Sequence, residues 1–141
     1  MMREFLIEDI SSYDLFFELV KFNSKINQVI YLTGEIGSGK TTLVQNYIKF
    51  LDKKKNAYSP TFSIINEYML DNNTLYHYDL YRIENYRELQ EIGIDYYFKQ
   101  KANHLIEWPE KFTKYLPKPD VIIEISYIEY FRRLRVLRNE K

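Results

Sequence analysis

The strongest constraint on the fold of this 141-residue chain is a glycine-rich segment, Gly34-Glu35-Ile36-Gly37-Ser38-Gly39-Lys40-Thr41. It fits the pattern G-x-x-x-x-G-K-[ST] at every position. Before it, residues 28–33 form an apolar run with too little alternation for a half-exposed strand. After it, residues 40–51 carry apolar side chains at helical spacing. A buried strand, a glycine loop and a helix in this order predict an α/β fold.

The chemistry that this loop predicts is the binding of phosphate groups. Glycines let successive backbone N–H groups point inward as a nest for phosphate oxygens, and the following helix adds the positive end of its dipole. We expect Lys40 to reach the β- and γ-phosphates of a nucleotide, Thr41 to offer a hydroxyl ligand to Mg²⁺, and Thr42 to hydrogen-bond the α-phosphate. The rest of the predicted cradle is Glu35, Ile36, Gly37, Ser38 and Gly39.

Three further segments are candidates for the same site. Thr61, in the extended segment 59–62, is placed to sense the γ-phosphate or Mg²⁺. Asp79, near the end of the strand-like run 74–80, is a candidate for holding Mg²⁺ directly or through water. Glu107 ends a short apolar run, where α/β folds place ligand groups. A loop turn, a strand-end cap and a structural carboxylate are the alternatives for the three residues. His77 is interpreted as a packing or hydrogen-bonding residue.

The remaining pattern completes the predicted architecture. Ser11 or Ser12 caps a helix through about residue 23, with Leu15, Phe16, Leu19 and Val20 on its buried face. Further strands are expected at residues 5–7, 62–70, 74–80, 104–107, 121–126 and 130–137, and a short helix at 85–91. The chain is therefore predicted to be one domain over residues 1–141, with a P-loop NTPase-like fold. That fold would have a central mixed sheet, flanking helices and an antiparallel portion.

Composition excludes several classes of protein. The chain has no Cys, so disulfide frameworks and thiolate metal sites are excluded. No apolar run approaches the ~20 residues that span a bilayer, and we expect a cytoplasmic protein that does not meet the membrane. Lys and Arg number 20, as do Asp and Glu, which argues against direct binding of nucleic acid as the main role. The arginine-rich end, residues 132–141, and the acidic segment 64–95 are candidate phosphate and partner surfaces, or ordinary solvated faces.

The type of nucleotide is narrowed by elimination. The chain has no Asp-x-x-Gly segment and no Asn-Lys-x-Asp segment, so GTPases are disfavoured and adenine is the default base. A small-molecule kinase stays open, because Arg132, Arg133 and Arg135 could imitate an arginine-rich lid, although strand-like residues surround them.

Four motifs together resemble one known family. They are the glycine loop extended to Leu32–Leu43, then Ser59-Pro60-Thr61-Phe62, His77-Tyr78-Asp79-Leu80-Tyr81-Arg82 and Glu107-Trp108-Pro109. In order and spacing they are similar to the TsaE family, the bacterial ATPases of tRNA threonylcarbamoyladenosine synthesis. The resemblance covers nearly the whole chain.

The resemblance implies a small Mg²⁺-dependent ATPase that acts with the subunits TsaD and TsaB and reaches tRNA only through that complex. Hydrolysis of ATP would be weak alone and stimulated by the partners. The motif match implies catalytic roles for Lys40, Asp79 and Glu107, with Thr41 and Glu107 binding Mg²⁺. It also implies an arginine near the nucleotide, Arg132 or Arg135. A nucleotide-gated binding module with negligible hydrolysis, and the small-molecule kinase, remain the alternatives.

Overall fold

The computed structural model describes residues 2–20, 27–54, 64–70 and 73–139. Their strands form one seven-stranded sheet in the order β1-β7-β6-β2-β5-β4-β3. The strands are β1 (Met2–Ile7), β2 (Val29–Thr33), β3 (Ile65–Leu70), β4 (Asn73–Asp79), β5 (Asn103–Glu107), β6 (Val121–Ile128) and β7 (Phe131–Arg138). The helices are α1 (Ser11–Val20), α2 (Lys40–Leu51), α3 (Tyr86–Glu91), α4 (Ile94–Phe98) and the 3₁₀ turn η1 (Pro109–Lys111).

The sheet is mixed, as predicted. β2 pairs in parallel with β5 and β6, and β4 pairs in parallel with β5. Antiparallel pairs close both sides, with β3 on β4 at one edge and β6, β7 and β1 at the other. The four buried residues of β2 match the expectation that a central parallel strand is covered on both faces. The α/β class with an antiparallel portion is thereby confirmed.

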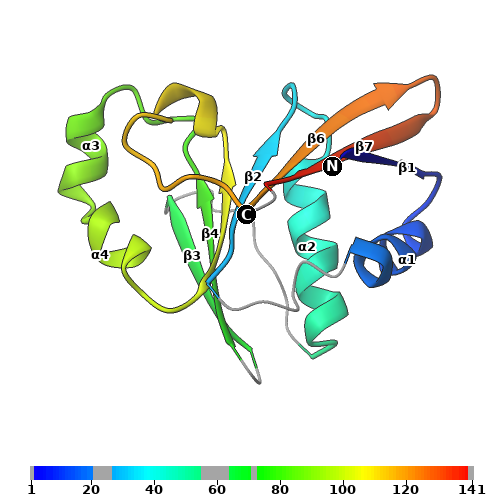
Figure 1. Ribbon diagram of the computed structural model, residues 1–141, viewed down its shortest axis with the longest axis horizontal. Coiled ribbons are helices and arrows are strands. Elements are labelled where there is room, and N and C mark those ends of the chain that lie inside the picture. Colours follow the sequence, from blue (N-terminus) through cyan, green and yellow to red (C-terminus); the bar gives the residue numbers. More distant parts are fainter. Residues whose placement is uncertain (1, 21–26, 55–63, 71–72, 140–141) are drawn as a thin grey trace.

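Helices cover the two faces of the sheet in separate pairs (Figure 1). α1 and α2 lie on one side, over a core that includes Leu32, Leu43 and Leu134. α3 and α4 lie on the other side, over a core that includes Tyr78 and Leu89. α2 begins directly after the glycine loop. The amino end of α2 therefore lies where the parallel strands have their carboxyl ends.

The first helix corrects two details of the sequence-based prediction. Its first turn is capped by Asp9, whose carboxylate accepts from the backbone N–H of Ser12 at 3.1 Å, and not by Ser11 or Ser12. Leu15 and Leu19 are 58% and 46% exposed, whereas the buried positions are Tyr13, Phe16, Phe17 and Val20. The helix is apolar around most of its circumference, so docking on α2 selects the face: Phe17 packs on Tyr47 with ring centroids 5.0 Å apart.

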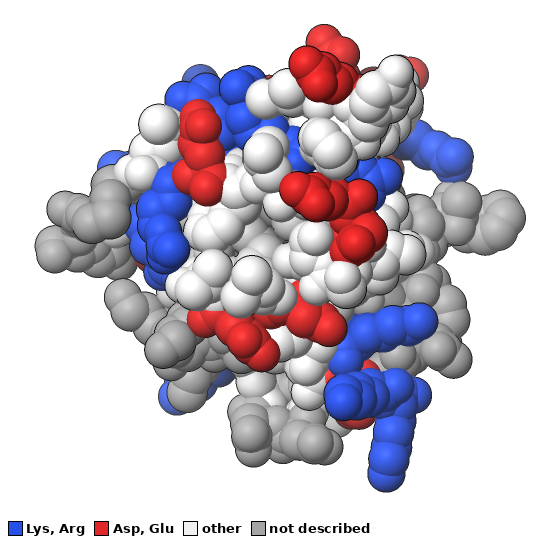
Figure 2. All heavy atoms as spheres, turned by 90° about the vertical axis from the view of Figure 1, so that its right-hand side faces the viewer, with Lys and Arg blue, Asp and Glu red and all other residues white. Residues whose placement is uncertain are grey.

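Of the remaining predicted elements, some are confirmed by the structure and others lie outside the described residues. The strands expected at 121–126 and 130–137 pair as β6 and β7. The segment 59–62, with Thr61, and the end of the first predicted helix lie outside the described residues. The side of the molecule that carries α1 and β1 shows acidic and basic side chains in small separate groups (Figure 2). Among the described residues, no helix has the length and apolar character required to cross a membrane.

Candidate functional site

The glycine loop lies between β2 and α2, and its backbone geometry requires glycine at two positions. Gly34 has φ +152°, and a Cβ there would lie 2.6 Å from the carbonyl oxygen of Ile125. Gly39 has φ +109°, and a Cβ there would lie 2.8 Å from Nε of Arg132. Both positive φ angles are strained for residues with a side chain. The loop therefore closes tightly against β6 and against the arginine of β7.

Lys40 occupies the mouth of this loop. Its ammonium group donates to the carbonyl oxygen of Gly34 and to that of Glu35, the latter at 3.0 Å. Burial lowers the pKa of Lys40, and the nearby carboxylates, Glu107 foremost, oppose that shift. A buried cation held among oxygen acceptors is suited to neutralise an anion that enters the loop.

One aromatic ring covers the lysine, and a second ring packs on the first. The ring of Trp108 lies 4.0 Å from Nζ of Lys40, and the ring of Tyr81 packs on Trp108 with centroids 4.9 Å apart. Trp108 has φ +60°, a left-handed conformation that bulky residues rarely adopt, directly after the end of β5. This turn directs the indole across the mouth of the loop, where it contacts the lysine through its π face.

Thr41 and Glu107 meet although 66 residues separate them in the sequence. The Thr41 hydroxyl lies 3.3 Å from Oε1 and 3.2 Å from Oε2 of Glu107. Glu107 is nearly fully buried, and its Oε2 also lies 2.5 Å from Nε2 of His77. The hydroxyl and the carboxylate thus converge from α2 and β5 on one point beside the loop.

Asp79 ends the neighbouring strand and lies opposite Glu107 in the β4–β5 register. Its carboxylate accepts from the backbone N–H of Tyr81 at 3.1 Å. Burial raises the pKa of Asp79, and the hydrogen bond from Tyr81 partly opposes the shift. Two carboxyl groups therefore stand side by side at the carboxyl ends of β4 and β5, facing Lys40.

Arg132, one of the two arginines predicted to lie near a nucleotide, borders the opposite end of the site. It donates to the hydroxyl of Tyr13 at 3.1 Å and to that of Tyr127 at 3.5 Å. Tyr127 in turn donates to the carbonyl oxygen of Gly37 at 2.9 Å. Arg135 lies on the other face of β7, in ion pairs of 3.4 Å with both Glu4 and Glu124.

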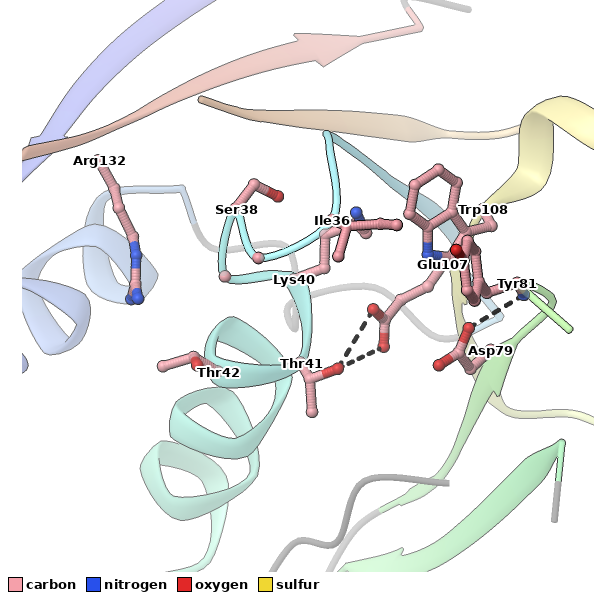
Figure 3. A pocket seen from close by; sticks show the side chains of 12 residues that line it. Ile36, Ser38, Lys40, Thr41, Thr42, Asp79, Tyr81, Glu107, Trp108 and Arg132 are labelled. Carbon is pink, nitrogen blue, oxygen red and sulfur yellow. Dashed lines mark hydrogen bonds between the residues drawn. The ribbon is translucent and has the colours of Figure 1, made fainter. Parts of the chain in front are cut away.

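These groups line one pocket of about 270 Å³ (Figure 3). Arg132 lies at one end and Asp79, Glu107 and Trp108 lie at the other, with Lys40 and Thr41 between them. Of the predicted site residues, Glu35 takes part only through its carbonyl oxygen, Arg135 does not line the pocket, and Thr61 lies outside the described residues. The full set of lining residues is Ile36, Gly37, Ser38, Gly39, Lys40, Thr41, Thr42, Asp79, Tyr81, Glu107, Trp108 and Arg132.

Two residues of the site could not be found from the sequence. Tyr13 and Tyr127 hold Arg132, and Tyr127 also holds the loop at Gly37. Neither tyrosine belongs to a motif, and in a chain with 14 tyrosines neither stands out. The elements that carry them, α1 and β6, come next to the loop only in the folded sheet.

The donor set fits a magnesium ion that is completed by ligands from a nucleotide. In the described part of the chain no group of three His, Cys, Asp or Glu residues could hold a metal by itself. Thr41 and Glu107 offer hard oxygen donors at one point, next to the glycine loop. Mg²⁺ is commonly bound in this way, by one or two protein oxygens together with phosphates and waters.

Comparison with known proteins gives consistent results. The model of the family described as "Threonylcarbamoyl adenosine biosynthesis protein TsaE" matches residues 11–134. The chain is 34% identical over 119 residues to the tRNA threonylcarbamoyladenosine biosynthesis protein TsaE of Haemophilus influenzae, which covers 84% of this chain and 75% of that protein. It is 34% identical over 129 residues to the protein of the same name from Rickettsia typhi, covering 89% and 87%.

A solved structure shares the fold. The crystal structure of YdiB from Bacillus subtilis matches with a TM-score of 0.74 and 25% identity, over 96% of this chain and 84% of that chain. The family match extends over most of the sequence, through both the glycine loop and the strand ends that line the pocket. This chain therefore belongs to the TsaE family.

Proposed function

We propose that this chain is the Mg²⁺-dependent ATPase of tRNA threonylcarbamoyladenosine biosynthesis and that it acts together with subunits of the TsaD and TsaB type. The observation that carries the proposal is the convergence of Lys40, Thr41 and Glu107 at the glycine loop. The names of the relatives, which all refer to this tRNA modification, support the biological role. A nucleotide bound here would be ATP, because the sequence lacks the Asp-x-x-Gly and Asn-Lys-x-Asp segments that are typical of GTPases.

The roles follow from the positions of the side chains. Lys40 would exchange its carbonyl partners for β- and γ-phosphate oxygens, so its buried charge stays compensated. Thr41 and Glu107 would hold Mg²⁺, and the bound ion supplies positive charge next to the phosphates. Asp79 would accept a hydrogen bond from a water molecule at the carboxyl end of β4, next to Glu107. Arg132 would meet the nucleotide at the other end of the pocket.

An arginine-rich kinase lid receives no support from the geometry. Arg133 and Arg135 lie on the face of β7 opposite to Arg132, and Arg135 is engaged by two carboxylates. Water is therefore the proposed phosphate acceptor.

The test is Mg-ATP hydrolysis by the chain alone and with a purified TsaB–TsaD pair. We expect slow hydrolysis alone and faster hydrolysis with the pair. Lys40→Ala is expected to weaken ATP binding, because the phosphates lose their buried cation, while Lys49→Ala, an exposed lysine of the same helix, should match the wild type. Normal ATP affinity in Lys40→Ala would contradict the proposed site.

A second pair of variants separates binding from hydrolysis. Glu107→Ala and Asp79→Ala are expected to reduce kcat by ~10²-fold or more and to change ATP affinity much less. ATP binding without hydrolysis by the wild type, alone and with the partners, would instead identify a nucleotide-gated module. Transfer of phosphate to an added small molecule would identify a kinase.

A further inference from the structure

A buried histidine contacts the carboxylate of Glu107, the proposed metal ligand, from the interior of the sheet. His77 lies in β4, two residues before Asp79, and is 0% exposed. Its Nε2 is 2.5 Å from Oε2 of Glu107. The same carboxylate meets the Thr41 hydroxyl on its other side. His77, Glu107 and Thr41 therefore form a continuous row from the interior of the sheet to the start of α2.

The hydrogen-bond chemistry gives this contact a direction. An ionised carboxylate only accepts hydrogen bonds, so His77 donates to Glu107 through Nε2–H, and Nδ1 is the second nitrogen of its ring. That Nδ1 is buried and has no hydrogen-bond partner among the described residues. An unpartnered buried ring nitrogen destabilises a fold, and an apolar side chain of similar size would avoid it. The contact with Glu107 accounts for an imidazole at this position, whereas packing alone does not.

The other histidine of the chain shows what a purely structural one looks like here. His104, in β5, accepts from the Tyr78 hydroxyl at Nδ1, with 2.7 Å between the atoms. Its Nε2 lies 3.3 Å from the carbonyl oxygen of Gln100. Both ring nitrogens are satisfied inside the core on the α3–α4 side, and neither contacts a residue of the pocket. The two histidines therefore serve as a matched pair.

We propose that His77 is a positioning residue for ATP hydrolysis, which orients Glu107 toward the metal ion and the Thr41 hydroxyl. The inference rests on the proposed function. His77 touches neither nucleotide nor metal and acts only through the Glu107 carboxylate. Hydrogen bonds of this kind fix the rotamer of a ligating side chain, and their loss typically lowers metal affinity or activity by 10–100-fold.

The first experiment measures kcat, KM for ATP and the Mg²⁺ concentration for half-maximal rate. The variants are His77→Leu, His77→Gln and, as the matched control, His104→Leu. We expect His77→Leu to lower kcat and raise the Mg²⁺ requirement by about 10–100-fold, with KM for ATP at saturating Mg²⁺ near the wild-type value. His77→Gln, whose amide can still donate to Glu107, should recover most of the loss. Thermal unfolding of all variants identifies any that do not fold.

The control distinguishes positioning from general loss of stability. His104→Leu removes a partner of Tyr78 and should lower the melting temperature, yet its kcat should equal that of the wild type. An equal loss of kcat in both leucine variants, or no recovery in His77→Gln, would overturn the proposal. In a Glu107→Gln background His77→Leu should have no additional effect, because the two residues act as one unit. A full additional loss there would also overturn it.

A binding measurement separates this inference from the proposed function. The single tryptophan, Trp108, lies against Lys40 and reports on the pocket by fluorescence. Mg²⁺ is titrated into each variant in the presence of ATP. If the wild type binds Mg-ATP but does not hydrolyse it, the proposed function fails, and this titration alone decides the role of His77. A half-saturating Mg²⁺ concentration about tenfold higher in His77→Leu, and unchanged in His104→Leu, supports positioning. Equal values in all variants overturn it.

Discussion

Tyr127 connects Arg132 with the glycine loop, which lies 90 residues before this tyrosine in the sequence. Its hydroxyl donates to Gly37 in the glycine loop and accepts from Arg132. The guanidinium group also lies over the Tyr127 ring, with 5.7 Å from Cζ to the ring centroid. The hydroxyl of one half-exposed tyrosine therefore holds the loop and the arginine at the same time.

Tyr127→Phe is expected to weaken ATP binding and to leave the fold intact. The ring remains, but the loop and Arg132 lose the hydroxyl that both of them contact. A net hydrogen bond contributes about 0.5–1.5 kcal/mol, so its loss should raise the Kd for ATP roughly 2–10-fold. Trp108 fluorescence measures the Kd, and Tyr130→Phe, which alters a tyrosine that is 93% exposed, is the control. An unchanged Kd in Tyr127→Phe would show that Arg132 does not depend on this hydroxyl.

His104 is expected to make the free energy of unfolding depend on pH. Burial lowers the pKa of His104 below its ordinary value of 6.5, although the Gln100 carbonyl partly opposes the shift. The unfolded chain then binds more protons than the folded chain, so the stabilisation is present above about pH 6.5 and is lost as pH falls toward the lower folded value. Urea unfolding between about pH 7.5 and 5.5 should therefore show a flatter pH dependence in His104→Gln. Parallel curves for the two proteins would contradict this role.

At the scale of elements, the short helix α3 is stabilised by the residue that precedes it. Asn85, immediately before it, accepts from the backbone N–H of Glu88 at 3.3 Å. A six-residue helix has little stability of its own, so its cap and the burial of Leu89 hold it on the sheet. The sequence pattern predicts this helix correctly because the cap and the buried residue are local signals.

Asn85→Ala is expected to reduce the free energy of unfolding by about 1 kcal/mol, the usual effect of removing a side-chain N-cap. Chemical denaturation measures the change. Asn139→Ala, at an exposed asparagine after β7, provides the comparison and should be near neutral. Equal effects of the two substitutions would mean that the Asn85 side chain does not cap α3.

The glycine loop and α2 illustrate how well a local unit can be predicted. The helix was expected at residues 40–51 and is observed at Lys40–Leu51. The glycines and the apolar spacing lie within one continuous stretch, so no distant contact has to be known. α1 differs, because six of its ten residues are apolar and could form more than one buried face, and only contacts such as Phe17 on Tyr47 decide between them.

At the scale of the whole molecule, the antiparallel edge of β6, β7 and β1 has two unequal faces. Leu134 of β7 is 0% exposed in the core beneath α1 and α2. Leu6 of β1 points to the other face and is 55% exposed. α1 and α2 cover only the first of these faces, so the same residue type has a different energetic role on each.

Leu134→Ala should therefore lower the free energy of unfolding by about 2–5 kcal/mol through lost burial and the cavity left behind. Leu6→Ala should change it by about 0.5 kcal/mol or less, as is usual for exposed positions. Urea denaturation of both variants checks the difference. Similar losses in the two would show that the outer face is covered in solution.

The sequence by itself determines the glycine loop, the strand before it and the helix after it, because these depend on neighbours in the chain. It also identifies Asp79 and Glu107 as residues at strand ends, where ligand groups gather. Lys40, Thr41, Asp79 and Glu107, the main residues selected in this way, line one pocket, whereas Thr61 is outside the described residues.

Only the tertiary structure decides which groups touch. The pairing of His77 with Glu107 across two strands, of Thr41 with Glu107, and of Tyr127 with Gly37 joins residues 30, 66 and 90 positions apart. A hydrophobic pattern indicates that a residue is buried but not against which neighbour, since strand order and register set that choice. The chemistry of single residues is therefore readable along the chain, whereas their hydrogen-bonded partners arise from the folded sheet.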